Sequence, residues 1–107
     1  MSAAPQVGPI FLDAADESIS IGTRGLAGVG LQLLGTWSGT VSFEATLDGE
    51  NWVAFNMVPA ASATVASSAT ANGAWSANCG GYDAVRARFS TATSGTVRAW
   101  MEASEGA

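Results

Sequence analysis

Apolar and polar residues alternate strictly over residues 41–47, with Val41 first and Leu47 last in the apolar series. This period of two predicts a β-strand with one buried and one solvated face, because successive side chains of a strand point to opposite sides. Asp48-Gly49 follows with the residue types of a tight hairpin turn, and Trp52 then begins a returning strand. The pattern requires an antiparallel β domain and indicates no chemistry by itself.

Further short strands are predicted between turn signals, and no segment shows a helical period. The predicted ranges are 17–21, 29–34, 40–48, 51–58, 74–79, 83–90 and 96–103. The apolar run 29–34 indicates a central strand covered on both faces, and Asn72-Gly73 and Thr93–Gly95 indicate hairpin turns. The low-complexity stretch 60–73 is interpreted as a loop carrying a short strand, with a flexible linker as the alternative. Together these signals predict an all-β fold, an antiparallel β-sandwich or jelly roll of seven to eight short strands.

The length of 107 residues fits one domain. We expect an extended N-terminal arm over residues 1–16, because Pro5 and Pro9 remove backbone donors that a regular element needs. The arm carries an apolar patch, residues 10–12, which packs either on its own domain or on a neighbouring subunit. The sandwich domain is expected at 17–104 and a loose tail at 105–107.

The charge of the chain excludes several classes of partner. Charged residues make up 12%, about half the usual share, and the net charge is −5 with four Arg and neither Lys nor His. Nucleic acids and anionic membranes are not expected partners, since both require a basic surface. The scarcity of charge has two explanations. Either part of the surface is buried against other copies of the chain or against a partner, or the protein has a flat β surface that needs little charge.

No transmembrane segment or signal peptide is recognised in the sequence, so we expect synthesis in the cytoplasm.

The sequence lacks the residues of the common catalytic and metal sites. Without His, no Ser-His or Cys-His nucleophile pair can form. A single cysteine, Cys79, excludes an internal disulfide and a thiolate zinc cluster. The carboxylates of Asp48 and Glu50 lie in a turn, where they are best explained as structural or solvated groups. We therefore predict no catalytic, cofactor-binding or metal-binding residues and no enzymatic activity.

Three arginines, Arg86, Arg88 and Arg98, are expected to project outward from two consecutive strands that pair as a hairpin. They form either a charge ladder with Glu44 and Glu102, or an interface with carboxylates of another subunit. Trp100 shares the face of Arg98 and is either an interface anchor or core. The predicted partner-binding residues are Ile10, Phe11, Leu12, Arg86, Arg88, Arg98 and Trp100.

Two stretches carry a family resemblance: residues 35–53, GTWSGTVSFEATLDGENWV, and residues 80–90, GGYDAVRARFS, with TSGTV at 93–97. They resemble segments of small β-sandwich virion proteins of tailed bacteriophages, a group that includes capsid decoration (cement) proteins, head fibres and tail components. The resemblance implies a non-enzymatic auxiliary capsid protein on the virion surface, which binds the major capsid protein and stabilises the assembled head. Low charge and the apolar patch fit a homo-oligomer, most simply a trimer.

The segment around Asp48 is also similar to the turn of galactose-binding, discoidin-like jelly rolls. This second likeness implies an alternative function, a carbohydrate-binding module of a phage tail or fibre that recognises the host surface. Trp37 and Trp52 would then supply the aromatic platforms. Since both lie at strand ends, they are equally well explained as core residues.

Overall fold

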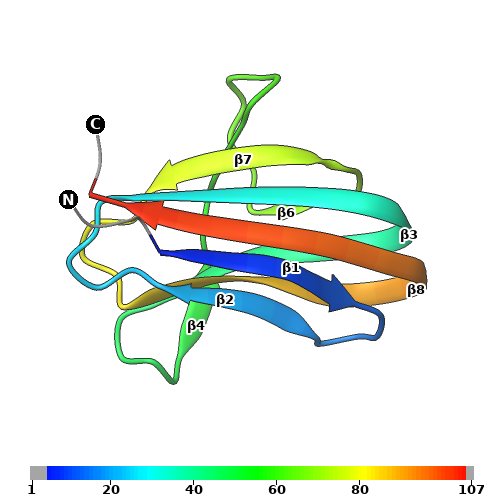
Figure 1. The fold of residues 1–107 in the computed structure, drawn as a ribbon, viewed down its shortest axis with the longest axis horizontal. Helices are drawn as coiled ribbons and strands as arrows, with labels where there is room; N and C mark the ends of the chain where they lie inside the picture. The colour runs from blue at the N-terminus through cyan, green and yellow to red at the C-terminus, as the bar shows by residue number, and fades with distance from the viewer. Residues whose placement is uncertain (1–4, 106–107) are drawn as a thin grey trace.

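Two long strands, β3 (Gly28–Thr46) and β8 (Ala84–Ser104), pair antiparallel along their whole length and organise the fold. Figure 1 shows this ribbon in the computed structural model, which describes residues 5–105. All regular elements in that range are strands. The remaining strands add to the two edges of the ribbon.

The β3–β8 ribbon bends near its middle. The register shifts between Ser38 and Gly39 and again between Thr40 and Val41, as β-bulges do. Gly39 has a φ of 139°, which side chains rarely allow, and a Cβ there would collide with the carbonyl oxygen of Thr91. The bend therefore requires glycine at this position.

Because of the bend, one continuous sheet folds over into two layers. The first layer contains the C-terminal half of β8, the N-terminal half of β3, and the strands β1 (Gln6–Leu12), β7 (Gly73–Asn78) and β5 (Val58–Pro59). The second layer contains the other halves of β3 and β8 with the strands β2 (Ser18–Gly22), β4 (Trp52–Ala54) and β6 (Ser68–Ala69). The predicted all-β, sandwich-like antiparallel fold is confirmed.

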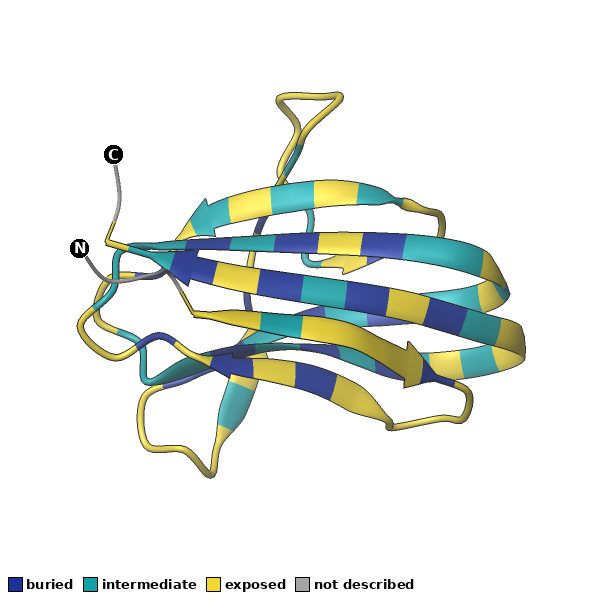
Figure 2. Cartoon of the chain, in the orientation of Figure 1, coloured by how far each residue is buried: buried dark blue, intermediate teal, exposed yellow. Residues whose placement is uncertain are grey.

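The core lies between the two layers, and buried positions alternate with exposed ones along β3 and β8 (Figure 2). Phe43 and Phe89 are the largest side chains that are fully buried. The ring of Phe43 packs against Trp75 of the opposite layer at 5.4 Å between centroids. Alternation along the strands thus places one apolar face of each layer against the other, as the sequence predicted.

Within the expected extended arm, residues 6–12 form a regular element, strand β1, which the prolines were expected to prevent. β1 pairs with β8 at the edge of the first layer, and its register shifts between Val7 and Ile10. Pro9 lies inside this bulge, where a missing N–H donor does not interrupt the pairing. Residues 1–4 of the expected arm and 106–107 of the expected tail lie outside the described residues.

Two predicted turns have a different role in the structure. Residues 93–95, predicted as a hairpin turn, lie inside the continuous strand β8, at the bend of the ribbon. Asn72-Gly73 joins β6 to β7, which belong to different layers, and so is not a hairpin turn either. The Asn72 side chain accepts a hydrogen bond from Trp37 Nε1 at 2.7 Å and donates one to the Gly35 carbonyl at 2.9 Å. Asn72 therefore ties this connection to the bend.

The turn at Asp48 joins β3 to β4 as predicted. Oδ1 of Asp48 accepts hydrogen bonds from the backbone N–H groups of Asn51 at 2.8 Å and Glu50 at 2.9 Å, which hold the pKa of Asp48 well below its usual range.

Two predictions about burial are wrong. Leu47 was expected to face the core but is 70% exposed, since the strand ends at Thr46. The run 29–34 is covered on one face only, because Gln32 is exposed.

Candidate partner-binding surface

The bend in the ribbon separates the arginines that the sequence grouped together. Arg86, Arg88 and Arg98 all belong to β8, so the predicted hairpin between two shorter strands is wrong. Arg86 and Arg88 lie on the outer face of the second layer, opposite β2, whereas Arg98 lies in the first layer opposite β1. The predicted site is thus divided between two sides of the sandwich.

Arg86 and Arg88 form a closed cluster with carboxylates of their own chain, here called the Glu44 cluster. Glu44 accepts hydrogen bonds from Arg86 Nε at 2.7 Å and Arg88 Nη2 at 3.0 Å, and Arg88 Nη1 lies 2.7 Å from Asp16 Oδ1. The Glu44 side chain is only 14% exposed. Hydrogen bonds from Arg88 and then Arg86 hold the pKa of Glu44 below its usual value, against the opposing effect of burial.

The Glu44 cluster favours the intrachain charge-ladder interpretation for Arg86 and Arg88. Glu102 does not take part, since it lies on the first layer opposite Gly30. The two tryptophans considered as sugar platforms are also engaged: the Arg86 guanidinium lies 4.3 Å from the Trp52 ring centroid, and Trp37 packs edge-on against Phe89 at 5.8 Å. These side chains are accounted for by the fold.

Two of the predicted residues, Phe11 and Arg98, lie side by side at the edge of the first layer and form what we call the β1 surface. Ile10 is opposite the buried Ala99 and points to the other side of the sheet. Phe11 is directly opposite Arg98 in the β1–β8 register, so both side chains point outward from the same face. Phe11 is 56% exposed and Ile10 is 37% exposed. Leu12, the third member of the predicted patch, is buried in the core and cannot contact a partner.

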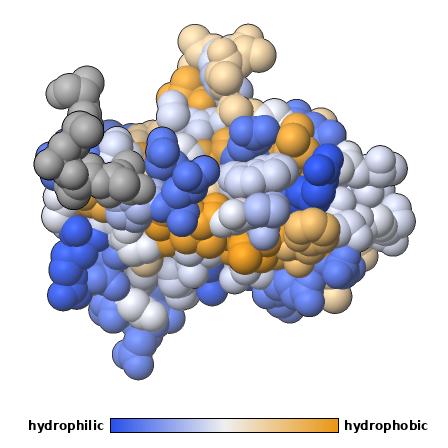
Figure 3. Space-filling model, viewed as in Figure 1, coloured by the Kyte–Doolittle hydropathy of each residue, from blue (hydrophilic) through white to orange (hydrophobic). Residues whose placement is uncertain are grey.

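The β1 surface borders a shallow hollow of about 520 Å³ at the bend. Phe11 and Arg98 line it together with Gly35, Gly95 and two threonines, Thr36 and Thr96. Figure 3 shows hydrophobic residues (orange) gathered across the middle of the face that contains β1 and β8. An exposed aromatic ring beside an arginine and a hollow is typical of an interface anchor.

A second concave region was missed by the sequence analysis. Gly28 and Gly30 alternate with the buried Val29 and Leu31, so the outer face of β3 has no side chains there. The spacing of Gly28 and Gly30, two positions apart at the start of the apolar run 29–34, is the signal that could have revealed it. Trp100 lines this region from β8.

Two solved structures share the fold of this chain. One is the SPBc2 prophage-derived protein YomS, with a TM-score of 0.75, 12% identity and 97% coverage of both chains. The other is the PBSX exported protein XepA, with a TM-score of 0.75 and 20% identity over 96% of this chain and 39% of XepA. The chain spans about two fifths of the length of XepA. At these identities the likeness establishes the fold alone.

No protein-family model matches the chain, and no curated protein matches it. Within residues 5–105, no three His, Cys, Asp or Glu side chains are grouped so that they could hold a metal ion. The same residues contain no helix that is long and apolar enough to span a membrane.

Proposed function

We propose that this protein is a non-enzymatic auxiliary capsid protein of a tailed bacteriophage, a decoration or cement protein that binds the major capsid protein on the assembled head. The observation that carries the proposal is the β1 surface, where Phe11 is exposed beside Arg98. A chain with so few charges that still exposes an aromatic side chain at a sheet edge is suited to docking on another protein.

The phage assignment rests on two kinds of support. Residues 35–53 and 80–90 resemble virion proteins of tailed phages. The fold is also that of a prophage-derived protein over nearly the whole length of both chains. The virion surface is accordingly the proposed location, and a homo-oligomer, with a trimer favoured, is the proposed assembly.

The mechanism of stabilisation is mass action. A subunit that binds the closed lattice, but not dissociated capsid protein, lowers the free energy of the assembled state relative to its parts. At a free concentration of roughly 100 times Kd, the gain per site is about 2.7 kcal/mol. This stabilisation requires only that a surface of the protein binds the capsid, and it involves no chemical reaction.

The proposal is tested with purified protein and phage heads that lack it. We expect the protein to sediment with the heads and to raise their melting temperature. The variant Phe11→Ser is expected to bind roughly 30-fold more weakly, since an aromatic anchor is worth about 2 kcal/mol or more.

The matched control is Val53→Ser, which removes a side chain of similar exposure, 58%, from β4 in the second layer. It should bind heads like the unmodified protein. Absence of binding to the heads, or equal losses of affinity for the heads in the two variants, would refute the proposal.

Light scattering of the free protein tests the proposed trimer. A monomer at high protein concentration would contradict it.

A further inference from the structure

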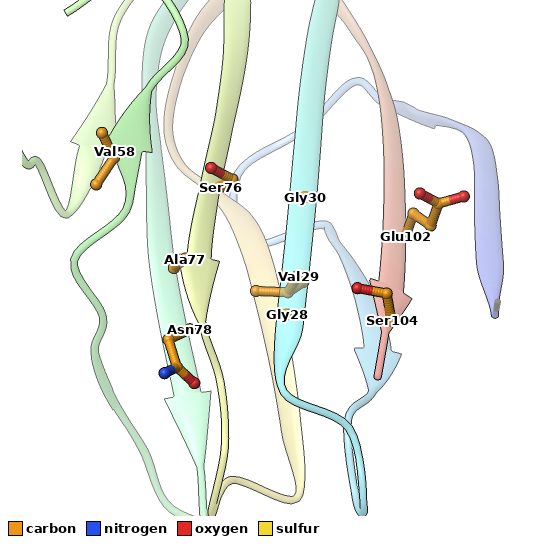
Figure 4. Close-up of a pocket in the computed structure, with 9 residues that line it drawn as sticks. All are labelled: Gly28, Val29, Gly30, Val58, Ser76, Ala77, Asn78, Glu102 and Ser104. Atoms are coloured by element: carbon orange, nitrogen blue, oxygen red, sulfur yellow. The ribbon is translucent and has the colours of Figure 1, made fainter. Parts of the chain in front are cut away.

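A groove runs along the outer face of the first layer, where β3 passes between β7 and β8. Its floor is the side-chain-free backbone of Gly28 and Gly30, and two adjoining hollows of about 390 and 270 Å³ share Gly30 and Glu102. Figure 4 shows Ser76 of β7 and Glu102 and Ser104 of β8 on either side of the glycines. We call this region the glycine groove.

The glycine groove contains polar side chains with no partner among the described residues, although one of its polar residues, Asn78, accepts a hydrogen bond from the Gly80 N–H at 2.9 Å. Among residues 5–105, no hydrogen bond from another residue reaches the side chains of Gln32, Ser76 or Glu102. On the opposite outer face, by contrast, Glu44 accepts from two arginines. The groove thus presents an amide, a hydroxyl and a carboxylate that are free to bind a ligand.

Trp100 adds an apolar surface at one end of the groove. The indole is half-buried, and the β1 backbone crosses it so closely that a Cβ on Gly8 would lie 2.9 Å from Trp100 Cδ1. The Arg98 guanidinium lies 5.9 Å from the Trp100 ring centroid. These neighbours hold the ring in one position, as a binding platform requires.

The chemistry of the groove selects among possible ligands. The backbone of β3 already pairs with β7 on one side and β8 on the other, so this stretch of the described chain offers an added peptide strand no free N–H or C=O groups. Among the described residues that line the groove, Glu102 is the only charged one, which disfavours anionic polymers. What remains is an aromatic surface with an amide, a hydroxyl and a single carboxylate along a shallow, open channel. We propose that the glycine groove binds an extended, uncharged glycan chain.

Gly30 allows a sharp test, because a side chain there fills the groove without disturbing the fold. The nearest atom to a Cβ on Gly30 is the Trp75 carbonyl oxygen at 3.8 Å. Valine also suits a strand better than glycine does. Gly30→Val should therefore fold with unchanged or higher stability and lose glycan affinity at least 30-fold.

The probes are neutral hexasaccharides, namely cellohexaose, chitohexaose and mannohexaose, titrated to millimolar concentration. Binding is followed by NMR at the Trp100 indole N–H and the backbone amides of β3, and we expect saturable shifts with at least one probe. The matched control is Gly22→Val in β2 of the second layer, where a Cβ would meet nothing of the described chain within 4 Å. This control should bind like the unmodified protein.

Three results would overturn the proposal: no shifts with any hexasaccharide, shifts that Gly30→Val leaves unchanged, or equally tight binding of an uncharged linear peptide such as hexaglycine. The test is independent of capsid binding. Phe11→Ser lies outside the groove lining and should keep full glycan affinity, so failure of one proposal can be distinguished from failure of the other.

Discussion

Gly39→Ala is expected to lower the free energy of unfolding by about 3–5 kcal/mol, a large part of the stability of a domain of this size. The φ of 139° at Gly39 costs an alanine roughly 1–3 kcal/mol. In addition, its Cβ would collide with the Thr91 carbonyl oxygen and lie 3.0 Å from Cε1 of Phe89, which is fully buried. Relief of these contacts requires the paired strands β3 and β8 to move apart at the bend, and equilibrium unfolding in denaturant measures the cost.

The control for Gly39→Ala is the same substitution at Gly22. Gly22 lies in β2, its φ is outside the strained range, and a Cβ added there would lie more than 4 Å from every other described residue except its chain neighbours. Gly22→Ala is therefore expected to change the unfolding free energy by less than about 1 kcal/mol. If the two variants were equally stable, the bend would not depend on the glycine.

Glu44→Gln is expected to destabilise the protein by about 2 kcal/mol at pH 7. The substitution keeps the size of the side chain but leaves the guanidinium groups of Arg86 and Arg88 without the carboxylate that pairs with both. Removing one partner of a largely buried pair costs more than the pair contributes, because the remaining charges stay desolvated. Since the arginine side chains are 24% and 27% exposed, we expect less than the full buried-pair penalty.

The cost of Glu44→Gln is expected to depend on pH. The pKa of Glu44 is lower in the folded protein than in the unfolded chain, because Arg88 and Arg86 stabilise the ionised form. Its contribution is therefore present above the unfolded value of about 4.3 and is lost as the pH falls through the folded value. Unfolding curves at pH 7 and at successively lower pH should show the difference between variant and parent shrinking below about pH 4.

Glu50→Gln is the matched control for the Glu44 cluster. The side chain of Glu50 is exposed in the turn after β3 and accepts no hydrogen bond from residues 5–105. Its replacement should change stability by less than about 0.5 kcal/mol at pH 7. A Glu44→Gln variant that is as stable as Glu50→Gln would contradict the role given to the cluster.

Much of the fold could be predicted because strand patterns are local. Alternation from Val41 to Ala45 and from Val85 to Phe89 identifies which residues face the core, since neighbouring side chains in a strand must point to opposite sides. The structural role of Asp48 follows equally from its short side chain, which reaches backbone N–H groups two and three residues ahead. Partner binding at Phe11, Ile10 and Arg98 remains a prediction. The structure places Phe11 beside Arg98, and Ile10 on the other side of β1.

Local patterns in the amino-acid sequence are enough to establish that the chain is all-β, which residues are buried along its main strands, and that Phe11 and Arg98 are candidates for a surface role. They do not establish whether the glycines at 39 and 95 end a strand or bend it. A glycine break is compatible with both outcomes, and the pairing of β3 with the distant β8 selects the bend. The β3–β8 pairing separates Arg98 from Arg86 and, with β7, leaves Gly28 and Gly30 as the floor of a groove. The pairing of β1 with β8, also distant in the sequence, brings Phe11 beside Arg98.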